Sequence, residues 1–214
     1  MPQWSNPPLI VYHGTDDISA GALMASAVRL ASCNPRTDFG QGFYTTTRLH
    51  QAKQWANQKL LRSSGSQYAV VVAFTLDRDW LSALDTLASV RPIWDFWDLI
   101  TDCRLGFPPH QRPAPRPLPY DVVYGPVTLW QQRLVIADCD QISFHTSRAL
   151  PGMGRPKMTA DAQLIPGNLF PYGDDPWIAY GGSHDAAGAR PPNFHREAGP
   201  ELNGRYSREF VLVH

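Results

Sequence analysis

Residues Tyr68 to Leu76 read YAVVVAFTL, and this stretch decides the expected fold. It is rich in β-branched residues and almost wholly apolar, which favours a central strand covered on both faces. Upstream of it, Arg48 to Leu61 predicts an amphipathic helix with Thr47 as its N-cap, because apolar residues recur there at three- and four-residue spacing. Those apolar positions are Leu49, Ala52, Trp55, Ala56, Leu60 and Leu61.

Further strands are expected on both sides of this helix and strand. A short helix is predicted over Arg78 to Leu87. Because strands dominate after residue 68 and regular βα alternation is missing, we expect an α+β fold, a split pair of mostly antiparallel sheets with helices outside. The other predicted strands are Leu9–Tyr12, which ends at His13 before Gly14, then Tyr120–Val127, Leu134–Phe144 and Glu209–Val213.

Two stretches are expected to lie outside regular structure. Residues 106–119 (GFPPHQRPAPRPLP) are dense in proline and predict an extended surface loop. The tail at 151–204 is rich in Gly, Pro and Asn and has no sustained period, so we expect it to wrap the core as loops. With 214 residues, the chain is expected to be one domain. Residues 1–150 would form its core, and 151–214 a loop-rich extension that packs on it and ends in a strand.

Composition excludes several classes of function. Nineteen basic residues balance nineteen acidic ones, which argues against a large surface for duplex nucleic acid. The apolar runs are too short to span a bilayer, and the N-terminus has no secretory signal, so we expect a cytoplasmic protein, with delivery into a target cell as the alternative. Cys33, Cys103 and Cys139 lie far apart without a CxxC pair, which favours small buried side chains in a reducing compartment.

Common catalytic motifs are missing from the sequence. The seven histidines include no HExxH and no pair at helical spacing, so we expect no metal. The stretch Phe39 to Phe43 (FGQGF) lacks both the Walker lysine and the third glycine of a dinucleotide-binding turn. No GxSxG elbow is present, and no cysteine has a neighbouring histidine.

Two segments remain that could bind a ligand. Val11 to Thr15 (VYHGT) places a histidine that can hydrogen-bond a ligand before a glycine whose backbone a ligand can approach closely. A capped turn is the alternative interpretation of this tripeptide. About 25 residues later, Asp38 to Thr47 (DFGQGFYTTT) leads into the predicted helix, and Trp55 lies 11 positions beyond Tyr44.

These segments resemble the ADP-ribosyltransferase superfamily, on the branch of diphtheria toxin and the poly(ADP-ribose) polymerases. The likeness is greatest to a bacterial family of uncharacterised ADP-ribosyltransferase-like proteins, and it covers residues 9 to 150 in the right order. The pattern of that family is YHG, DFGxGFYxTT followed by QAKxWA, YDxVxGPV, and DQxxF followed by TxxAL. The matching blocks here are Tyr12–Gly14, Asp38–Thr46 with Gln51–Ala56, Tyr120–Val127, and Asp140–Phe144 with Thr146–Leu150.

The resemblance implies an NAD site in a cleft between two small sheets. His13 would hold the adenine-side ribose, and the backbone of Gly14 would bind the nicotinamide carboxamide. Trp55 would stack on the nicotinamide ring, with Tyr44 as the opposite wall, in a cation–π arrangement. The alternative for Trp55 is a core residue on the apolar face of the helix. Thr15 and Gly42 complete the expected NAD-binding set.

The third motif departs from the superfamily, where a catalytic glutamate binds the nicotinamide ribose. Block order places Gln141 at that position, and glutamine can orient a ribose but cannot supply a negative charge or accept a proton. Glu209, before the last predicted strand, is the second candidate, with an exposed terminal glutamate as its alternative. The expected catalytic residues are therefore Gln141, Glu209 and Tyr44.

The resemblance leads us to expect mono-ADP-ribosyl transfer from NAD to a macromolecule, either protein or nucleic acid. NAD glycohydrolysis and a catalytically silent NAD-fold binding module are the alternatives. A bacterial enzyme of this type would act as a toxin, a delivered effector or a phage-defence enzyme, with an antitoxin or immunity protein as a further partner. Housekeeping modification is the alternative role.

Overall fold

The computed structural model describes residues 8–26, 28–107, 119–158, 194–196 and 211–213, and these form an α+β fold. The helices are α1 (Asp17–Ser26), α2 (Leu49–Arg62), α3 (Arg78–Ser82) and α4 (Trp94–Leu105). The 3₁₀ turns are η1 (Leu30–Ser32), η2 (Trp130–Gln132), η3 (Ser147–Ala149) and η4 (Pro151–Met153). The strands are β1 (Leu9–Asp16), β2 (Phe43–Thr45), β3 (Ala69–Leu76), β4 (Thr86–Ala88), β5 (Val122–Leu129), β6 (Leu134–Phe144), β7 (Lys157–Met158), β8 (Phe194–Arg196) and β9 (Val211–Val213).

The strands form two sheets. The first has the order β1-β3-β7 and is antiparallel, with β3 in its centre, as the sequence of Tyr68 to Leu76 predicts. The second has the order β2-β6-β5-β4-β9, with β8 also paired to β6; its β4–β5 pair is parallel and its other pairs are antiparallel. Tyr12 of β1 and Thr46, which follows β2, connect the sheets by two reciprocal backbone hydrogen bonds of 2.8 and 2.9 Å.

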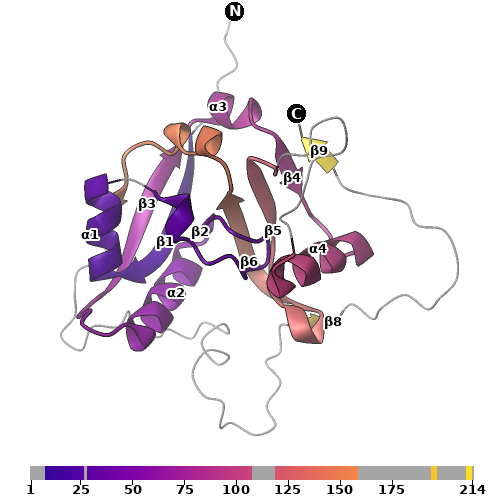
Figure 1. Cartoon of the computed structure of the whole chain (residues 1–214), viewed down its shortest axis with the longest axis horizontal. Helices are drawn as coiled ribbons and strands as arrows, with labels where there is room; N and C mark the ends of the chain where they lie inside the picture. Colours follow the sequence, from indigo (N-terminus) through magenta and orange to yellow (C-terminus); the bar gives the residue numbers. More distant parts are fainter. Residues whose placement is uncertain (1–7, 27, 108–118, 159–193, 197–210, 214) are drawn as a thin grey trace, which may run out of the picture.

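Helices cover the sheets from outside (Figure 1). Helix α1 lies at the outer side of the β1–β3 sheet and α4 at the far end of the molecule, beside β5. One hydrophobic core joins the first sheet to α2 and includes Val11, Ala52 and Phe74. A second core lies under α4 and includes Phe39, Phe96 and Val123. None of the helices in the described ranges is long and apolar enough to cross a membrane.

Several predicted elements need correction. Strand β1 continues to Asp16, so His13 lies inside a strand, and the expectation of a strand end or a capped turn there is wrong. The predicted helix at 78–87 stops at Ser82, and its last residues enter β4. Thr47 does not cap α2: Arg48 occupies the cap position, and the Thr47 hydroxyl instead donates to the Asp140 carboxylate.

Helix α2 buries a different face from the one that its apolar spacing predicts. Ala52 and Ala56 are buried as expected, but Trp55 is 39% exposed and Leu61 is 68% exposed. Polar side chains take part of the buried face, namely Gln51, Gln54 and Asn57. Trp55 is therefore not a core residue.

The described parts of the C-terminal extension form strands rather than loops alone. Strand β7 extends the first sheet, while β8 and β9 pair with the second. The rest of the predicted loop region at 159–193, most of the proline-rich stretch (108–118) and Glu209 lie outside the described residues. Of the cysteines, Cys103 and Cys139 are buried as expected, and Cys33 is half-buried.

Candidate functional site

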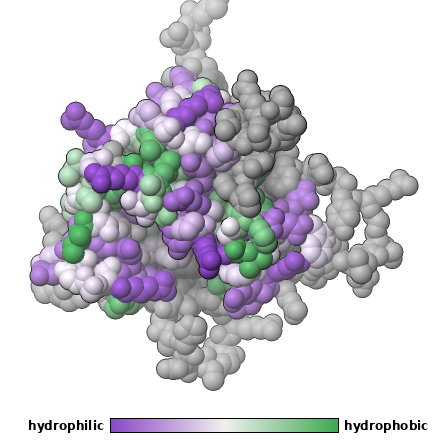
Figure 2. Space-filling model, viewed as in Figure 1, coloured by the Kyte–Doolittle hydropathy of each residue, from purple (hydrophilic) through white to green (hydrophobic). Residues whose placement is uncertain are grey.

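A cavity of about 410 Å³ lies where the two sheets meet. Strands β1 and β2 contribute one wall and helix α2 another, while Val127 and Thr128 of β5 and Gln141 of β6 reach it from the second sheet. The face drawn in Figure 2 carries hydrophobic patches on either side of a more hydrophilic band. The lining residues are Tyr12, His13, Gly14, Asn34, Thr37, Asp38, Tyr44, Thr45, Thr46, Gln51, Ala52, Trp55, Gln58, Lys59, Arg62, Arg104, Val127, Thr128 and Gln141.

His13 is fixed in one orientation on β1. Its ring lies 4.5 Å from that of Phe43, and its Nδ1 is 2.7 Å from the carbonyl oxygen of Tyr44. Burial lowers the pKa of His13, so the imidazole is neutral near pH 7. Because a carbonyl only accepts, Nδ1 carries the proton and donates, which leaves Nε2 as a hydrogen-bond acceptor.

Gly14 allows β1 and α2 to pack directly against each other. A Cβ at this position would lie 1.9 Å from the Ala52 carbonyl oxygen and 2.7 Å from the Ala56 nitrogen, so any side chain would collide with the helix backbone. The YHG and QAKxWA blocks are thus in direct contact. This close approach places residues of α2 beside His13 at the cavity wall.

Tyr44 offers the cavity its ring rather than its hydroxyl. The hydroxyl donates to the Gly40 carbonyl oxygen at 2.9 Å and accepts from the Phe39 N–H and the Thr37 hydroxyl at 2.9 and 2.7 Å. Burial raises the pKa of Tyr44, so this phenol does not ionise in the physiological range. Its hydrogen bonds hold the turn at 37–40 in place. Because the hydroxyl donates once and accepts twice within the protein, it is not placed to transfer a proton to a ligand.

Helix α2 supplies the aromatic and cationic part of the lining. Trp55 contributes a large, partly exposed ring. Lys59, one helical turn further, and Arg62, two turns further, also line the cavity. The side chain of Lys59 is 53% exposed, and its ammonium group lies 4.0 Å from the Asp16 carboxylate.

Gln141 reaches the cavity from β6 and belongs to a buried polar network. Its Nε2 donates to Asp38 Oδ2 at 2.7 Å and to the Pro126 carbonyl oxygen at 2.9 Å. Thr128 donates to the same Asp38 oxygen at 2.9 Å, and Arg104 donates twice to the other one. The network joins α4, β5, β6 and the DFG segment at the floor of the cavity.

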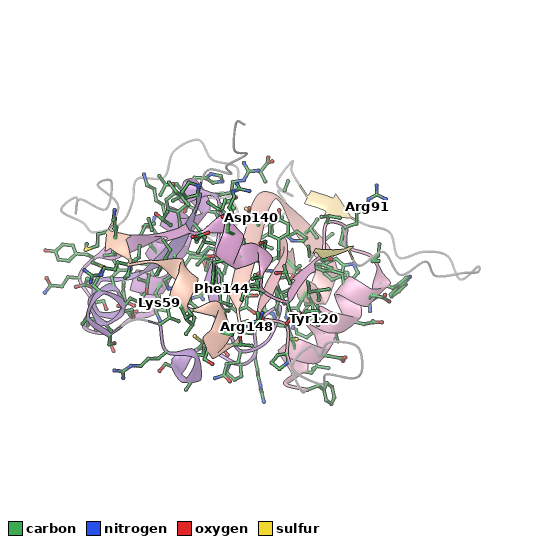
Figure 3. All side chains as sticks on the ribbon, turned by 90° about the horizontal axis from the view of Figure 1, so that it is seen from above. Lys59, Arg91, Tyr120, Asp140, Phe144 and Arg148 are labelled. Carbon is green, nitrogen blue, oxygen red and sulfur yellow. The ribbon has the colours of Figure 1, made fainter. Side chains whose placement is uncertain are left out.

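Asp140 and Gln51 connect α2 to β6, with Gln51 at the cavity wall. The Gln51 amide makes two bonds to the backbone of Asp140, donating to its carbonyl oxygen at 2.7 Å and accepting from its N–H at 3.0 Å. The Asp140 carboxylate accepts from the Thr46 hydroxyl at 2.6 Å and from the Thr47 N–H at 2.9 Å. In Figure 3, Asp140 and Phe144 lie near the middle of the molecule, between Lys59 on one side and Tyr120 on the other.

Five of the predicted site residues line the cavity. They are His13, Gly14, Tyr44, Trp55 and Gln141. Thr15 and Gly42 do not line it. Thr15 is buried in β1, and Gly42 makes room for the ring of His145, which a Cβ at residue 42 would meet at 2.7 Å. Glu209 lies outside the described residues. In the described ranges, no three His, Cys, Asp or Glu side chains gather in a way that could hold a metal ion.

Sequence reasoning missed Asp38 and Arg104 as partners. Arg104 lies in a helix that was not predicted, although two signals mark α4: the spacing of Phe96, Ile100 and Cys103, and Gly106 in the left-handed conformation at its end. Asp38 stands in the DFG block, but nothing in a single sequence shows which cation it meets 66 residues later.

The fold and the site define an α+β protein with a polar, partly aromatic cavity at the junction of two sheets. The profile of the family described as "Protein of unknown function (DUF3990)" matches residues 9–131, more than half of the chain, so the chain belongs to this family. The matched range includes the YHG, DFG and YGPV blocks and stops before Gln141. A comparison with curated proteins gave no match.

Proposed function

We propose that this protein transfers ADP-ribose from NAD to a macromolecular acceptor and releases nicotinamide. The observation that carries the proposal is that His13, Tyr44, Trp55 and Gln141, which come from four separate segments, line one cavity. These are the residues to which the resemblance to ADP-ribosyltransferases assigns NAD contacts. A volume of about 410 Å³ suits a nucleotide held in an extended form along an open cleft.

The hydrogen-bonding state of His13 fits a ribose hydroxyl. Its Nδ1–H is used by the Tyr44 carbonyl, and its neutral ring leaves Nε2 to accept. A hydroxyl is a donor that this acceptor can bind without any change of protonation. The contact with Phe43 holds the ring in place before a ligand arrives, which lowers the entropy cost of binding.

The rings of Trp55 and Tyr44 suit the nicotinamide end. A cationic pyridinium next to an electron-rich ring is favoured by about 0.5–2 kcal/mol, and the preference disappears once nicotinamide leaves as a neutral molecule. Lys59 and Arg62 lie on the same helix as Trp55 and suit the diphosphate. On this proposal the nicotinamide ring would lie at Trp55 and the diphosphate towards Lys59 and Arg62.

The chemistry that these residues can assist is limited by Gln141. In the transfer, the bond between the ribose C1 and the nicotinamide nitrogen breaks, a bond from C1 to the acceptor nucleophile forms, and the acceptor proton passes to solvent. Gln141 can accept a hydrogen bond from a ribose hydroxyl and orient the sugar, but it cannot remove that proton. The proposal therefore favours single transfer to a nucleophilic acceptor over chain elongation.

Incubation with NAD labelled in its adenosine part tests the proposal. With bacterial lysate present, we expect label on macromolecules and release of nicotinamide. Free ADP-ribose alone would instead support NAD glycohydrolysis, and intact NAD that still binds would support a silent binding module. Absence of NAD binding by calorimetry would contradict all three. Mass spectrometry of the labelled adduct then identifies the acceptor as protein, DNA or RNA.

As its biological role, we propose that the protein acts as a toxin, a delivered effector or a phage-defence enzyme. Its further partner would be a cognate antitoxin or immunity protein. Only the resemblance supports this setting. Induced expression in bacteria is expected to stop growth, and His13→Ala is expected to weaken the effect at equal protein level. Normal growth with active protein in the cells would favour housekeeping modification.

A further inference from the structure

The strongest unexplained feature of the site is the buried carboxylate of Asp38, whose side chain is 3% exposed. Arg104 donates to Oδ1 through Nε at 2.8 Å and through Nη2 at 2.6 Å. Thr128 and Gln141 donate to Oδ2 at 2.9 and 2.7 Å. A carboxylate that accepts this many hydrogen bonds is held in one position.

Asp38 determines which way the Gln141 amide points. Nε2 gives one hydrogen to Asp38 and the other to the Pro126 carbonyl oxygen, so both donors of the amide are used and both meet groups that can only accept. The reversed amide would place its oxygen against a carboxylate and a carbonyl. The observed orientation of the amide is therefore fixed. In this orientation Nε2 makes both hydrogen bonds, and Oε1 is the atom that can accept a further one.

Oε1 is also available to a ligand. Within the described residues it accepts no hydrogen bond, and it is not among the fully enclosed polar atoms that lack a partner. Gln141 lines the cavity, so a ligand bound there lies next to this side chain.

We propose that Asp38, braced by Arg104, is the positioning residue of this site: it presents Gln141 Oε1 to a ligand hydroxyl and requires an amide at residue 141. The inference rests on the proposed function for the identity of that hydroxyl as one of the nicotinamide ribose. It explains why the chain has glutamine where ADP-ribosyltransferases have glutamate. A glutamate would place a carboxylate oxygen about where Nε2 now lies, 2.7 Å from Asp38 Oδ2.

A double-mutant cycle on stability tests the pair without any ligand. In Gln141→Glu, two carboxylates must share the site, so one of them holds a proton with a raised pKa. The variant is therefore expected to melt lower than the wild type, by an amount that grows between pH 5 and pH 8. Asp38→Asn/Gln141→Glu should regain more than half of that loss at pH 8, because an asparagine can donate to the new glutamate and keep its oxygen for Arg104. Additive losses, or a Gln141→Glu deficit independent of pH, would overturn the inference.

Steady-state kinetics with NAD test the positioning role. A misplaced Oε1 should lower kcat by about 10- to 100-fold in Asp38→Asn, while KM changes by less than about threefold. Asp121→Asn is the matched control. Asp121 is another buried aspartate that pairs with an arginine, Arg148, at 3.2 Å, and it does not line the cavity. This control should lose stability but keep kcat.

The two proposals fail in different ways. Wild-type protein that neither binds nor consumes NAD would contradict the proposed function, and the stability cycle would still decide whether Asp38 dictates an amide at residue 141. If the wild-type protein consumes NAD and Asp38→Asn has the same kcat, the positioning role alone would be overturned.

Discussion

His145 is a partly buried imidazole outside the cavity, and its surroundings make the stability of the fold sensitive to acid. Its Nδ1 lies 2.9 Å from the Gln41 carbonyl oxygen and its Nε2 lies 2.7 Å from the Ser143 hydroxyl. Burial lowers the pKa of His145 to about 4. In the unfolded chain the ring takes up a proton near pH 6.5, so the unfolded state binds more protons than the native state between these values.

The free energy of unfolding is therefore expected to fall as the pH drops from about 6.5 towards 4, by roughly 1–2 kcal/mol between pH 7 and pH 5 from this group alone. Urea unfolding at these two pH values measures the loss. His145→Asn, which can still donate to Gln41 but does not titrate, should show a smaller difference. Equal pH dependence in the two proteins would contradict the assignment.

A second prediction at the scale of one residue concerns the glycines. Gly14→Ala places a Cβ 1.9 Å from the backbone of α2, so we expect a loss of at least about 3 kcal/mol or failure to fold. Gly21→Ala in α1 is the matched control, because its Cβ would meet no atom within 4 Å. That variant should be neutral or up to about 1 kcal/mol more stable, since alanine favours the helix. Equal melting temperatures in both variants would show that α2 does not pack as described.

Ligand contacts give a third prediction. His13→Ala and Trp55→Ala are each expected to weaken NAD binding by about 10-fold, because one loses a hydrogen bond and the other a cation–π contact. Leu61→Ala is the control, since Leu61 is exposed on the same helix and does not line the cavity. Calorimetry measures the affinities, and circular dichroism confirms that the variants fold. Unchanged affinity in both cavity variants would mean that NAD does not bind there.

At the scale of elements, the Gln51 amide is the main polar link between α2 and β6. We expect Gln51→Ala to destabilise the protein by about 2–3 kcal/mol, because it leaves both backbone groups of Asp140 without their partner. Amide exchange should accelerate at Asp140, whose N–H loses its acceptor, and remain slow in the centre of β3. Unchanged exchange at Asp140 would contradict the role of this link.

The sequence predicts an element well where its apolar residues are also its buried residues, and poorly where they are not. Strands β3 and β6 are rich in apolar and β-branched residues, and their predicted ranges nearly coincide with the observed ones. Helix α1 was missed because its residues are mostly apolar although Ala20 alone is buried, so no amphipathic period marks the helix. Its start was marked by Asp16, which accepts from the Ser19 N–H at 2.8 Å.

The candidate site was predictable to the extent that it is encoded in local motifs. His13, Tyr44 and Trp55 stand in short blocks, and the structure brings them to one cavity with Gln141. The bracing of Gln141 by Asp38 was not predictable, because these residues are 103 positions apart and only the tertiary fold brings the segment before β2 next to β6. The roles of Thr15 and Gly42 were inferred from proximity in sequence, which does not fix the direction of a side chain.

At the scale of the whole molecule, the net charge is zero, so only charges near the cavity can attract an anionic ligand. With 19 basic and 19 acidic residues, the chain has no overall attraction for an anionic ligand, so any salt dependence must come from cations at the cavity. We expect NAD affinity to fall several-fold between about 50 and 500 mM salt, because Lys59 and Arg62 are screened there. Titration calorimetry of wild type and of Lys59→Gln/Arg62→Gln measures this. The double variant should bind more weakly and be nearly insensitive to salt, whereas a salt effect of equal size in both would place the relevant charges elsewhere.

The two hydrogen bonds between Tyr12 and Thr46 have a consequence for motion. They join the two sheets beside the cavity, whereas β1 and β3 are paired over eight consecutive residue pairs within one sheet. Opening this junction would break the two Tyr12–Thr46 bonds and the His13–Tyr44 bond and would loosen the core that the sheets share, while the ladders within each sheet stay intact. The amide protons of Tyr12 and Thr46 should thus report on a hinge at the mouth of the cavity, and their exchange with deuterium should slow when a ligand holds both sheets at once.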